Sequence, residues 1–368
     1  MATLNREALK VEFLAANGFG DARREALSGD ASTRRYERLH LAGGTRLIFM
    51  DQPPSAETTP CPPDASPEAR AALGYNALAR LAAGRVEAFI AVAAWLRGQG
   101  LSAPEVIAHD AGSGLAVLED LGDDLFAVMI ARGQAERPLY EAAINALVRM
   151  HDATAPRVLT APGGITWPLL DYDALALKTA TDLLPAWLPK LRPQIRLDLE
   201  ALAAWEDIWA PIRVRAAVGA GTSGVFCHRD YHAENLIWLP HRRGAARAGL
   251  IDFQDAVRAP PAWDMSMLLH DARRDISPEL EAWALERYCQ LRPLVDQQAF
   301  TADFHALGAL NISRILGIFA RLVSRDGKPR YGAFMPRLWA YLNTCLADPD
   351  LADLKAWFDR HIPQDARR

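Results

Sequence analysis

The stretch that decides the fold is residues 226–236 (FCHRDYHAENL), followed after a gap by residues 250–255 (LIDFQD). It contains Asp230, then Asn235 five positions later, and then Asp252 at the end of an apolar run. Two carboxylates and an amide in this order are the minimum set for holding metal-bound phosphates beside a hydroxyl nucleophile. We therefore interpret the stretch as the catalytic loop of a phosphotransferase.

Two short apolar runs, residues 236–239 and 248–251, flank a basic turn that contains glycine. This pattern predicts a β-hairpin, which would bring Asp252 back beside Asn235. The two side chains offer an anionic and a neutral oxygen, the hard ligands that suit magnesium. Asp230 is free of that constraint, so we predict that it accepts the proton of the attacking hydroxyl.

The composition is that of a globular protein. The 368 residues are 50% hydrophobic and 23% charged, which excludes the disordered and fibrous classes. A net charge of −4 gives no broad electrostatic reason to bind nucleic acid or an anionic membrane. We therefore expect a small-molecule partner, with no nucleic-acid and no membrane partner.

The amino terminus has no apolar core of signal-peptide length, and no uncharged apolar stretch reaches the roughly 18 residues of a membrane span. The four cysteines are scattered without paired metal-ligand spacing, which favours reduced structural thiols over disulfides or zinc. We expect a cytoplasmic protein. A monomer is the expected oligomeric state, with a dimer as the alternative.

The first third of the chain predicts an antiparallel sheet. Four apolar runs, in two pairs separated by glycine-containing turns, read as two hairpins: residues 36–41, 45–50, 106–109 and 115–118. Apolar residues at helical spacing predict helices over residues 4–17 and 67–96, the second interrupted near Gly84. Six prolines over residues 52–70 predict an exposed loop, which we interpret as an insertion.

Two polar segments border this sheet. Residues 28–35 (SGDASTRR), which include Ser32, form a small polar loop whose backbone could approach a phosphate closely; an ordinary turn is the alternative. After the last strand, the stretch from Glu119 through Leu121 contains polar residues and leads to a glycine. It predicts a hinge whose backbone hydrogen-bonds an adenine ring, with an ordinary strand-to-helix connection as the alternative.

From residue 122 onward the hydrophobic spacing is mainly helical. We therefore predict an α+β fold with a small antiparallel-sheet lobe over residues 1–121 and a larger helical lobe over residues 122–368. Asp264 follows two prolines at the start of a helix, which favours a structural support under the catalytic loop over a substrate ligand. His228 is expected to order the same loop through hydrogen bonds.

These motifs resemble the aminoglycoside phosphotransferase and choline kinase-like family, whose small-molecule kinases share the bilobal protein-kinase-like fold. The residues that carry this resemblance are 228–236 (HRDYHAENL), 251–255 (IDFQD) and 263–269 (WDMSMLL). Within the family the chain looks most like the anomeric kinases of N-acetylmuramate and N-acetylglucosamine from cell-wall recycling. That narrower resemblance is carried by residues 29–36 (GDASTRRY), 118–123 (LEDLGD) and 271–275 (DARRD).

The resemblance implies a kinase that uses ATP and Mg²⁺ to phosphorylate the anomeric hydroxyl of an amino sugar. It also implies that Asp230 is the base, that Asn235 and Asp252 bind magnesium, and that backbone around Glu119 to Leu121 receives the adenine.

The first lobe departs from the family pattern in one way. Kinases usually carry a lysine on the third strand to hold the nucleotide phosphates, but Met50 stands there, and no lysine occurs between Lys10 and Lys178. Arginine can meet the phosphate charge instead, because a guanidinium binds two phosphate oxygens at once. The nearby candidates are Arg34, Arg35, Arg38 and Arg46. We choose Arg34 or Arg35.

The acceptor site is predicted in the helical lobe. The candidate substrate-binding residues are His232, Asp255, Arg273 and Arg274, with Trp167 and Tyr172 as possible neighbours of the cleft. An arginine would suit a lactyl carboxylate such as that of N-acetylmuramate. Residues 271–275 fit a solvated helix face with internal ion pairs equally well, and His232 fits a substrate contact and a scaffold equally well.

Two other functions remain as alternatives. An aminoglycoside or choline-type kinase would need an acidic cleft for its cationic acceptor, and the arginines after Asp271 argue against it. A nucleotide-binding pseudokinase is allowed by the missing lysine. The presence of Asp230, Asn235 and Asp252 argues against it, because a protein that only binds nucleotide needs no such set.

Overall fold

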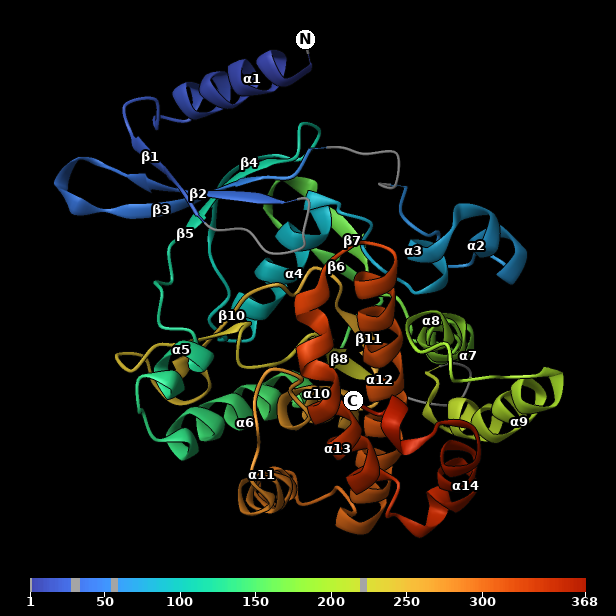
Figure 1. The fold of residues 1–368 in the computed structure, drawn as a ribbon. Helices are drawn as coiled ribbons and strands as arrows, with labels where there is room; N and C mark the ends of the chain where they lie inside the picture. The colour runs from blue at the N-terminus through green and yellow to red at the C-terminus, as the bar shows by residue number, and fades with distance from the viewer. Residues whose placement is uncertain (1, 28–33, 54–58, 219–223) are drawn as a thin grey trace.

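The structure is a computed structural model that describes residues 2–27, 34–53, 59–218 and 224–368. It has a sheet-containing part and a larger, mainly helical part, which confirms the predicted fold class (Figure 1). The sheet is antiparallel, in the order β1-β2-β3-β5-β4. Its strands are β1 (Arg23–Ala26), β2 (Arg35–His40), β3 (Arg46–Asp51), β4 (Val106–Asp110) and β5 (Leu115–Glu119). Both predicted hairpins of this sheet are confirmed.

The two faces of the sheet follow the alternation of side chains along its strands. Leu47 and Phe49 of β3 pack with Phe13 of α1, which lies across the outer face (Figure 1). Met50 points the other way and joins the main core together with residues of α4. The position where kinases carry a lysine is therefore filled by an apolar core side chain, and Lys10 is bonded to Glu37 at 2.7 Å. The helices before β4 are α1 (Ala2–Ala16), α2 (Pro67–Leu73), α3 (Tyr75–Leu78) and α4 (Val86–Gly98).

Most of the described residues of the proline-rich segment are exposed, as predicted, but a few are buried. In its described part, Cys61 and Arg70 are each only 3% exposed, and α2 already begins at Pro67. Arg70 and Arg80 both donate to the carboxylate of Asp173 in the helical part, at 2.6 and 2.9 Å. The ion pair of Arg70 attaches the end of the segment to the helical part. Its origin as an insertion stays a prediction.

The helical part is built around one long helix, α12, which packs against α8, α10 and α13 (Figure 1). Among the described residues, α12 alone is long and apolar enough to cross a membrane, but 67% of its apolar window is buried, as in a core helix. At Gly317 it crosses α8 so closely that an added Cβ would lie 2.4 Å from the carbonyl carbon of Leu183. The first five helices of the helical part are α5 (Phe126–Ala131), α6 (Glu136–Asp152), α7 (Ala174–Thr181), α8 (Leu183–Leu191) and α9 (Leu199–Ala216). The later helices are α10 (Ala262–Leu269), α11 (Pro278–Leu291), α12 (Gln297–Ser324), α13 (Met335–Cys345) and α14 (Ala352–His361).

Three two-stranded sheets complete the fold, and two of them frame the catalytic loop. The loop leaves β8, which pairs with β11, and enters β9, which pairs with β10. The β9–β10 pair confirms the predicted hairpin between the two halves of the motif. The boundary between residues 121 and 122, where the chain leaves β5, stays a proposal. The short strands are β6 (Val158–Thr160), β7 (Thr166–Pro168), β8 (Val225–Cys227), β9 (Leu236–Trp238), β10 (Ala248–Leu250) and β11 (Val257–Ala259).

Candidate active site

The catalytic loop is held from its buried side by Asp264 of α10. The carboxylate of Asp264 accepts the backbone N–H groups of His228 and Arg229, at 2.7 and 2.8 Å, and its side chain is fully buried. The indole N–H of Trp263 donates to the carbonyl of Arg229 at 3.1 Å. Arg229 has φ 81°, a left-handed conformation that non-glycine residues adopt only when their surroundings hold them there. These bonds therefore fix the backbone immediately before Asp230.

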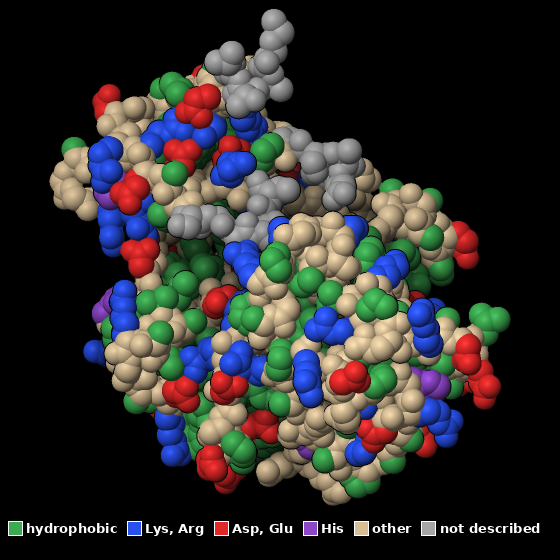
Figure 2. Space-filling view, in the orientation of Figure 1, with side chains coloured by type: hydrophobic (Ala, Val, Ile, Leu, Met, Phe, Trp, Pro, Cys, Tyr) green, Lys and Arg blue, Asp and Glu red, His purple; other side chains and the backbone are tan. Residues whose placement is uncertain are grey.

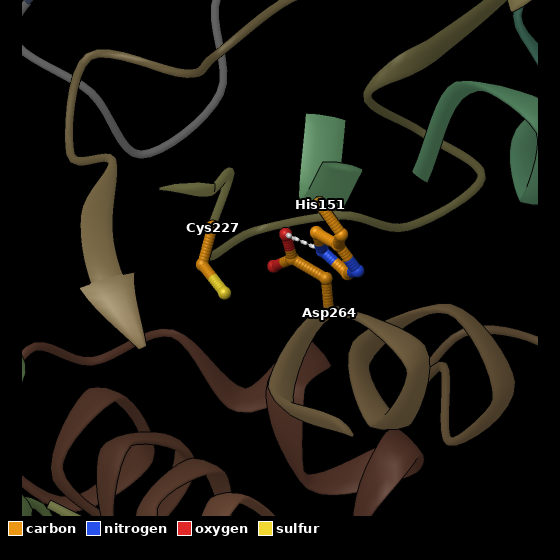
Figure 3. A group of neighbouring side chains, drawn as sticks. All are labelled: His151, Cys227 and Asp264. Atoms are coloured by element: carbon orange, nitrogen blue, oxygen red, sulfur yellow. Dashed lines mark ion pairs between the residues drawn. The ribbon is translucent and has the colours of Figure 1, made fainter. Parts of the chain in front are cut away.

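Figure 3 shows Asp264 with His151 of α6 and Cys227 of β8 turned toward it. Nε2 of His151 lies 3.8 Å from the Asp264 carboxylate, and its other ring nitrogen is bonded to the hydroxyl of Tyr288 at 2.8 Å. Burial lowers the pKa of His151 and raises that of the Cys227 thiol well above its usual value. Because both carboxylate oxygens already accept backbone N–H groups, we interpret this group as a brace for the catalytic loop rather than a metal site.

The side chain of Arg229 ties the loop to the segment that precedes α4. Its guanidinium is buried and donates to the carbonyls of Ala79 and Arg80, at 2.8 and 3.1 Å. The same segment is bonded to the second half of the motif, because Asp255 accepts the N–H of Ala82 at 2.7 Å. Three separate stretches of chain therefore meet at the site.

Asn235 is oriented by two hydrogen bonds. Its Nδ2 donates to the carbonyl of Asp230 at 2.9 Å, which leaves Oδ1 as the atom that could meet a cation. Its own carbonyl accepts the N–H of Ile251 at 3.1 Å, so the residue before Asp252 is joined directly to Asn235. His228, which is fully buried, is bonded through Nε2 to the carbonyl of Ile251 at 3.0 Å. The predicted return of Asp252 to Asn235 is thus observed.

Asp252 also adopts a left-handed conformation, with φ 62°. Its Oδ1 forms an ion pair with Arg34 and accepts the side-chain N–H of Gln254 at 3.1 Å. Arg34 in turn donates to Oε1 of Gln254 at 2.7 Å. Burial would raise the pKa of Asp252, but the positive charge of Arg34 lowers it below its usual value. The predicted metal ligand is therefore ionised, and an arginine is its partner.

The other residues predicted to contact the nucleotide differ in their surroundings. Arg35 is exposed, and Ser32 lies outside the described residues. Arg38 is bonded to Asp120 at 2.8 Å and to Asp123 at 2.7 Å, so its charge is used at the end of β5. Arg38 therefore has carboxylate partners of its own, and a phosphate contact by Arg38 stays a prediction. Arg46 lies 3.6 Å from Asp120 and shares the same role.

The predicted hinge follows β5. Glu119 is held by ion pairs with Arg97 and Arg242, at 3.2 and 2.6 Å. The side chain of Leu121 packs with Ile237 and neighbouring apolar residues of the helical part. The side chains of Glu119 and Leu121 are therefore occupied by contacts within the protein.

The predicted acceptor residues have protein partners. Asp255 is bonded to the segment before α4, and burial raises its pKa. Arg273 pairs with Glu234 of the catalytic loop at 2.7 Å, and Arg274 pairs with Glu136. Residues 271–275 form a turn rather than a helix face, which corrects that alternative.

Three aromatic or imidazole side chains complete these candidates. His232 is half-buried, with Nε2 3.3 Å from the amide nitrogen of Asn235. Trp167 and Tyr172 are 7% and 1% exposed, so both belong to the core rather than to a cleft. Tyr172 packs edge-on against Trp263 beneath the loop. Both side chains are buried, and their nearness to the acceptor stays a prediction.

One residue near Asp230 was not predicted. Nη2 of Arg314, in the middle of α12, lies 3.9 Å from Oδ1 of Asp230. The signal in the sequence was a cation and Asn311 within the apolar run 306–320, where a surface helix would show a polar face instead.

Figure 2 shows a hollow in the surface between the sheet-containing part and the helical part. Two other surface cavities, of about 550 and 530 Å³, lie away from the catalytic loop. One is lined by residues of α9 and α14, and the other by residues of α6 and α11. Neither cavity is lined by a residue of the motif. We therefore locate the candidate active site from the geometry of the catalytic loop.

Solved structures with a similar fold are small-molecule kinases. A choline/ethanolamine kinase family protein from Mesorhizobium loti has a TM-score of 0.54 at 16% identity, covering 96% of this chain and 98% of that chain. An aminoglycoside phosphotransferase solved with ADP bound has a TM-score of 0.52 at 14% identity, covering 91% of this chain and 97% of the other. This fold, with its acid–amide–acid loop, is that of the protein-kinase-like phosphotransferases.

The pattern of the Phosphotransferase enzyme family matches residues 23–300, and the chain belongs to that family. It is 67% identical over 363 residues to an N-acetylmuramate/N-acetylglucosamine kinase of Caulobacter vibrioides, covering 99% of this chain and 98% of the relative. It is 32% identical to a protein of the same name from Pseudomonas aeruginosa, covering 93% of this chain and 90% of the relative. The predicted family is confirmed.

Proposed function

We propose that this protein is a cytoplasmic, ATP-dependent kinase that phosphorylates the anomeric hydroxyl of N-acetylmuramate and N-acetylglucosamine, giving the sugar 1-phosphate in cell-wall recycling. The observation that carries the proposal is 67% identity, over almost the full length of both chains, to a relative named for these two sugars. The intact set of Asp230, Asn235 and Asp252 supports catalysis rather than nucleotide binding alone.

In this mechanism the sugar hydroxyl attacks the terminal phosphorus of ATP. A bond forms between the hydroxyl oxygen and phosphorus, the bond from phosphorus to the bridging oxygen breaks, and ADP leaves with that electron pair. The proton of the hydroxyl passes to the carboxylate of Asp230, whose side chain is 32% exposed and hence reachable by a substrate. His228 and Asp264 support the loop from its buried side.

Asn235 and Asp252 would hold Mg²⁺. The donor set fits the ion, because Asn235 has its amide nitrogen bonded and its oxygen left over, and Asp252 is an ionised carboxylate. When bound, the ion would neutralise charge on the nucleotide phosphates.

The adenine would be received by backbone around Glu119 and Leu121. The ion pair between Arg34 and Asp252 supports Arg34, over the exposed Arg35, as the arginine that meets the phosphates. Ser32 stays a predicted contact in the loop before β2.

For the acceptor we propose a small-molecule amino sugar, bound between the catalytic loop and the turn at residues 271–275. Arg273 supports this through its bond to Glu234, which brings the turn against the loop. Arg274, His232 and Asp255 stay proposed contacts, and a monomer stays the proposed state.

Incubation of the purified protein with ATP and Mg²⁺ and a panel of acceptors tests the proposal. We expect turnover on N-acetylmuramate and N-acetylglucosamine, with an acid-labile phosphate ester at the anomeric carbon. Turnover confined to choline or kanamycin would replace the acceptor class. Absence of turnover on every acceptor, with nucleotide still bound, would favour the pseudokinase.

A further inference from the structure

The least expected charge near the site belongs to Arg314. Its side chain is only 12% exposed, although a buried guanidinium is costly unless its charge and its N–H groups are compensated. Its Nε donates to Oδ1 of Asn311 at 2.9 Å, and its guanidinium carbon lies 5.8 Å from the centre of the Trp263 ring. These contacts fix the orientation of the side chain, and neither of them uses a terminal nitrogen as a hydrogen-bond donor.

The support for this orientation reaches further into the core. Asn311 is 1% exposed, and its own amide nitrogen lies 2.7 Å from the sulfur of Met267. A buried asparagine in the apolar interior of a long helix is explained by its bond to Arg314, because a buried amide needs hydrogen-bond partners. The guanidinium is therefore preorganised by α10 and α12 rather than by a surface loop.

The terminal nitrogens of Arg314 face the proposed base. The separation of 3.9 Å between Nη2 and Oδ1 of Asp230 is too long for a hydrogen bond. In the part of the chain that the structure describes, the terminal N–H groups of Arg314 make no hydrogen bond. A fixed cation with unused donors beside a catalytic carboxylate is suited to an anion that arrives with the substrates.

We propose that Arg314 donates hydrogen bonds to the phosphoryl group during its transfer to the acceptor. This inference rests on the proposed function, since it needs Asp230 to be the base. The base must lie within about 3 Å of the attacking hydroxyl, so Nη2 of Arg314 stands within about 7 Å of that oxygen, and the phosphorus under attack lies about 3 Å from the same oxygen. Charge on the phosphoryl oxygens is where preorganised donors accelerate transfer most.

The carboxylate of N-acetylmuramate is the other anion available. It is attached through ring carbon 3, two ring atoms from the anomeric carbon, and is therefore farther from the base than the phosphoryl group. N-acetylglucosamine has no such carboxylate, whereas the relatives are named for both sugars. Both considerations favour the phosphoryl group.

The test compares Arg314→Met and Arg314→Lys with the wild-type protein, with kcat and KM measured for ATP and for each sugar. We expect Arg314→Met to lower kcat on the order of 100-fold with both sugars, while each KM changes less than about threefold. Arg314→Lys retains the charge without the planar fork and should lose about tenfold. Guanidinium ion at millimolar concentration should restore part of the activity of Arg314→Ala.

Arg215→Ala is the matched control. Arg215 lies on α9 and pairs at 3.6 Å with Asp303 of α12, the helix that carries Arg314, and this pair is exposed. Its kcat should stay within about twofold of the wild type. An unchanged kcat in Arg314→Met would overturn the proposal, and so would a loss confined to N-acetylmuramate with a raised KM, which would assign Arg314 to the carboxylate.

The acceptor class and the role of Arg314 can be tested separately. The wild-type panel alone decides whether amino sugars are the acceptors, and the Arg314 comparison can be made on whichever acceptor is used, or on hydrolysis of ATP by water. If Arg314→Met does not fold, Arg314→Lys keeps the cation in its pocket, and a wild-type kcat in that folded variant, with no guanidinium rescue of Arg314→Ala, counts against the proposal.

Discussion

The proposed base and the proposed metal ligand each have an arginine partner, but the two pairs are built differently. Arg34, just before β2, makes a direct ion pair with Asp252, whereas Arg314, inside α12, stops 3.9 Å short of Asp230. The contacts of Asp252 with Arg34 and Gln254 both use Oδ1, so a cation at Asp252 would share the carboxylate with Arg34. The carboxylate on the nucleotide side is therefore already paired with an arginine, whereas the one on the acceptor side is not.

The largest effect is expected at the base. Asp230→Asn removes the proton acceptor while preserving shape, so kcat should fall about 1,000-fold. Because Asp230 is not a proposed metal ligand, additional Mg²⁺ should not restore activity, and ADP binding measured by calorimetry should be retained. Recovery at high Mg²⁺ would show that the roles of the two acids are misassigned.

Asp252→Asn should respond to metal where Asp230→Asn does not. Loss of the anionic ligand should raise the Mg²⁺ concentration for half-maximal activity on the order of 100-fold. Titration of activity with Mg²⁺ at fixed ATP measures this shift. A fall in kcat that is the same at every Mg²⁺ concentration would contradict metal binding by Asp252.

A smaller effect separates two neighbouring arginines. Arg34→Ala should raise the KM for ATP about tenfold, because Arg34 stands at Asp252 beside the proposed phosphate site. Arg35→Ala is the matched control, since Arg35 is exposed, and its KM should change less than about twofold. Equal KM values for both variants and the wild type would mean that neither Arg34 nor Arg35 meets the nucleotide phosphates.

The smallest effect is expected for His151, which belongs to the brace under the catalytic loop, and it concerns stability rather than turnover. Burial lowers the folded-state pKa of His151, so below about pH 6.5 the unfolded chain binds a proton that the folded protein resists. The associated stability is complete above that pH and is lost as the pH falls. Between pH 7.5 and pH 5 the wild type should lose up to about 2 kcal/mol more free energy of unfolding than His151→Gln.

Urea unfolding at several pH values measures this difference. His241→Gln serves as the control, because it removes an exposed histidine instead of a buried one. Parallel curves for His151→Gln and the wild type would mean that His151 is not held neutral by its surroundings.

The sequence predicted the parts of this site that depend on neighbours along the chain. The hairpin between Asn235 and Asp252 follows from two short apolar runs and a turn, and its pairing is observed. Strands β2 to β5 of the sheet follow from periodicity in the same way, whereas the short edge strand β1, with the sequence RREA, was not predicted. Local pattern also identified Asp264, whose position after two prolines indicated a support for the loop.

What the sequence could not predict depends on contacts between distant segments. Arg314 approaches Asp230 only because α12 crosses α10, and nothing close to either residue in the chain indicates that meeting. The partners of Arg273 and Arg274 are glutamates in the catalytic loop and in α6 rather than the adjacent aspartates. Composition predicted exposure for residues 52–70, and most of the described ones are exposed, but composition carries no information about the ion pair with Asp173 that accompanies the burial of Arg70.

The bonds from Arg229 to Ala79 and Arg80, and from Asp255 to Ala82, have a mechanical consequence for closure over a nucleotide. They attach the chain just before α4 to the catalytic loop, and Phe89 of α4 stacks on Phe253 at 4.8 Å. We expect α4 to stay with the helical part while the sheet slides across it, a shear rather than a swing of sheet and helix together.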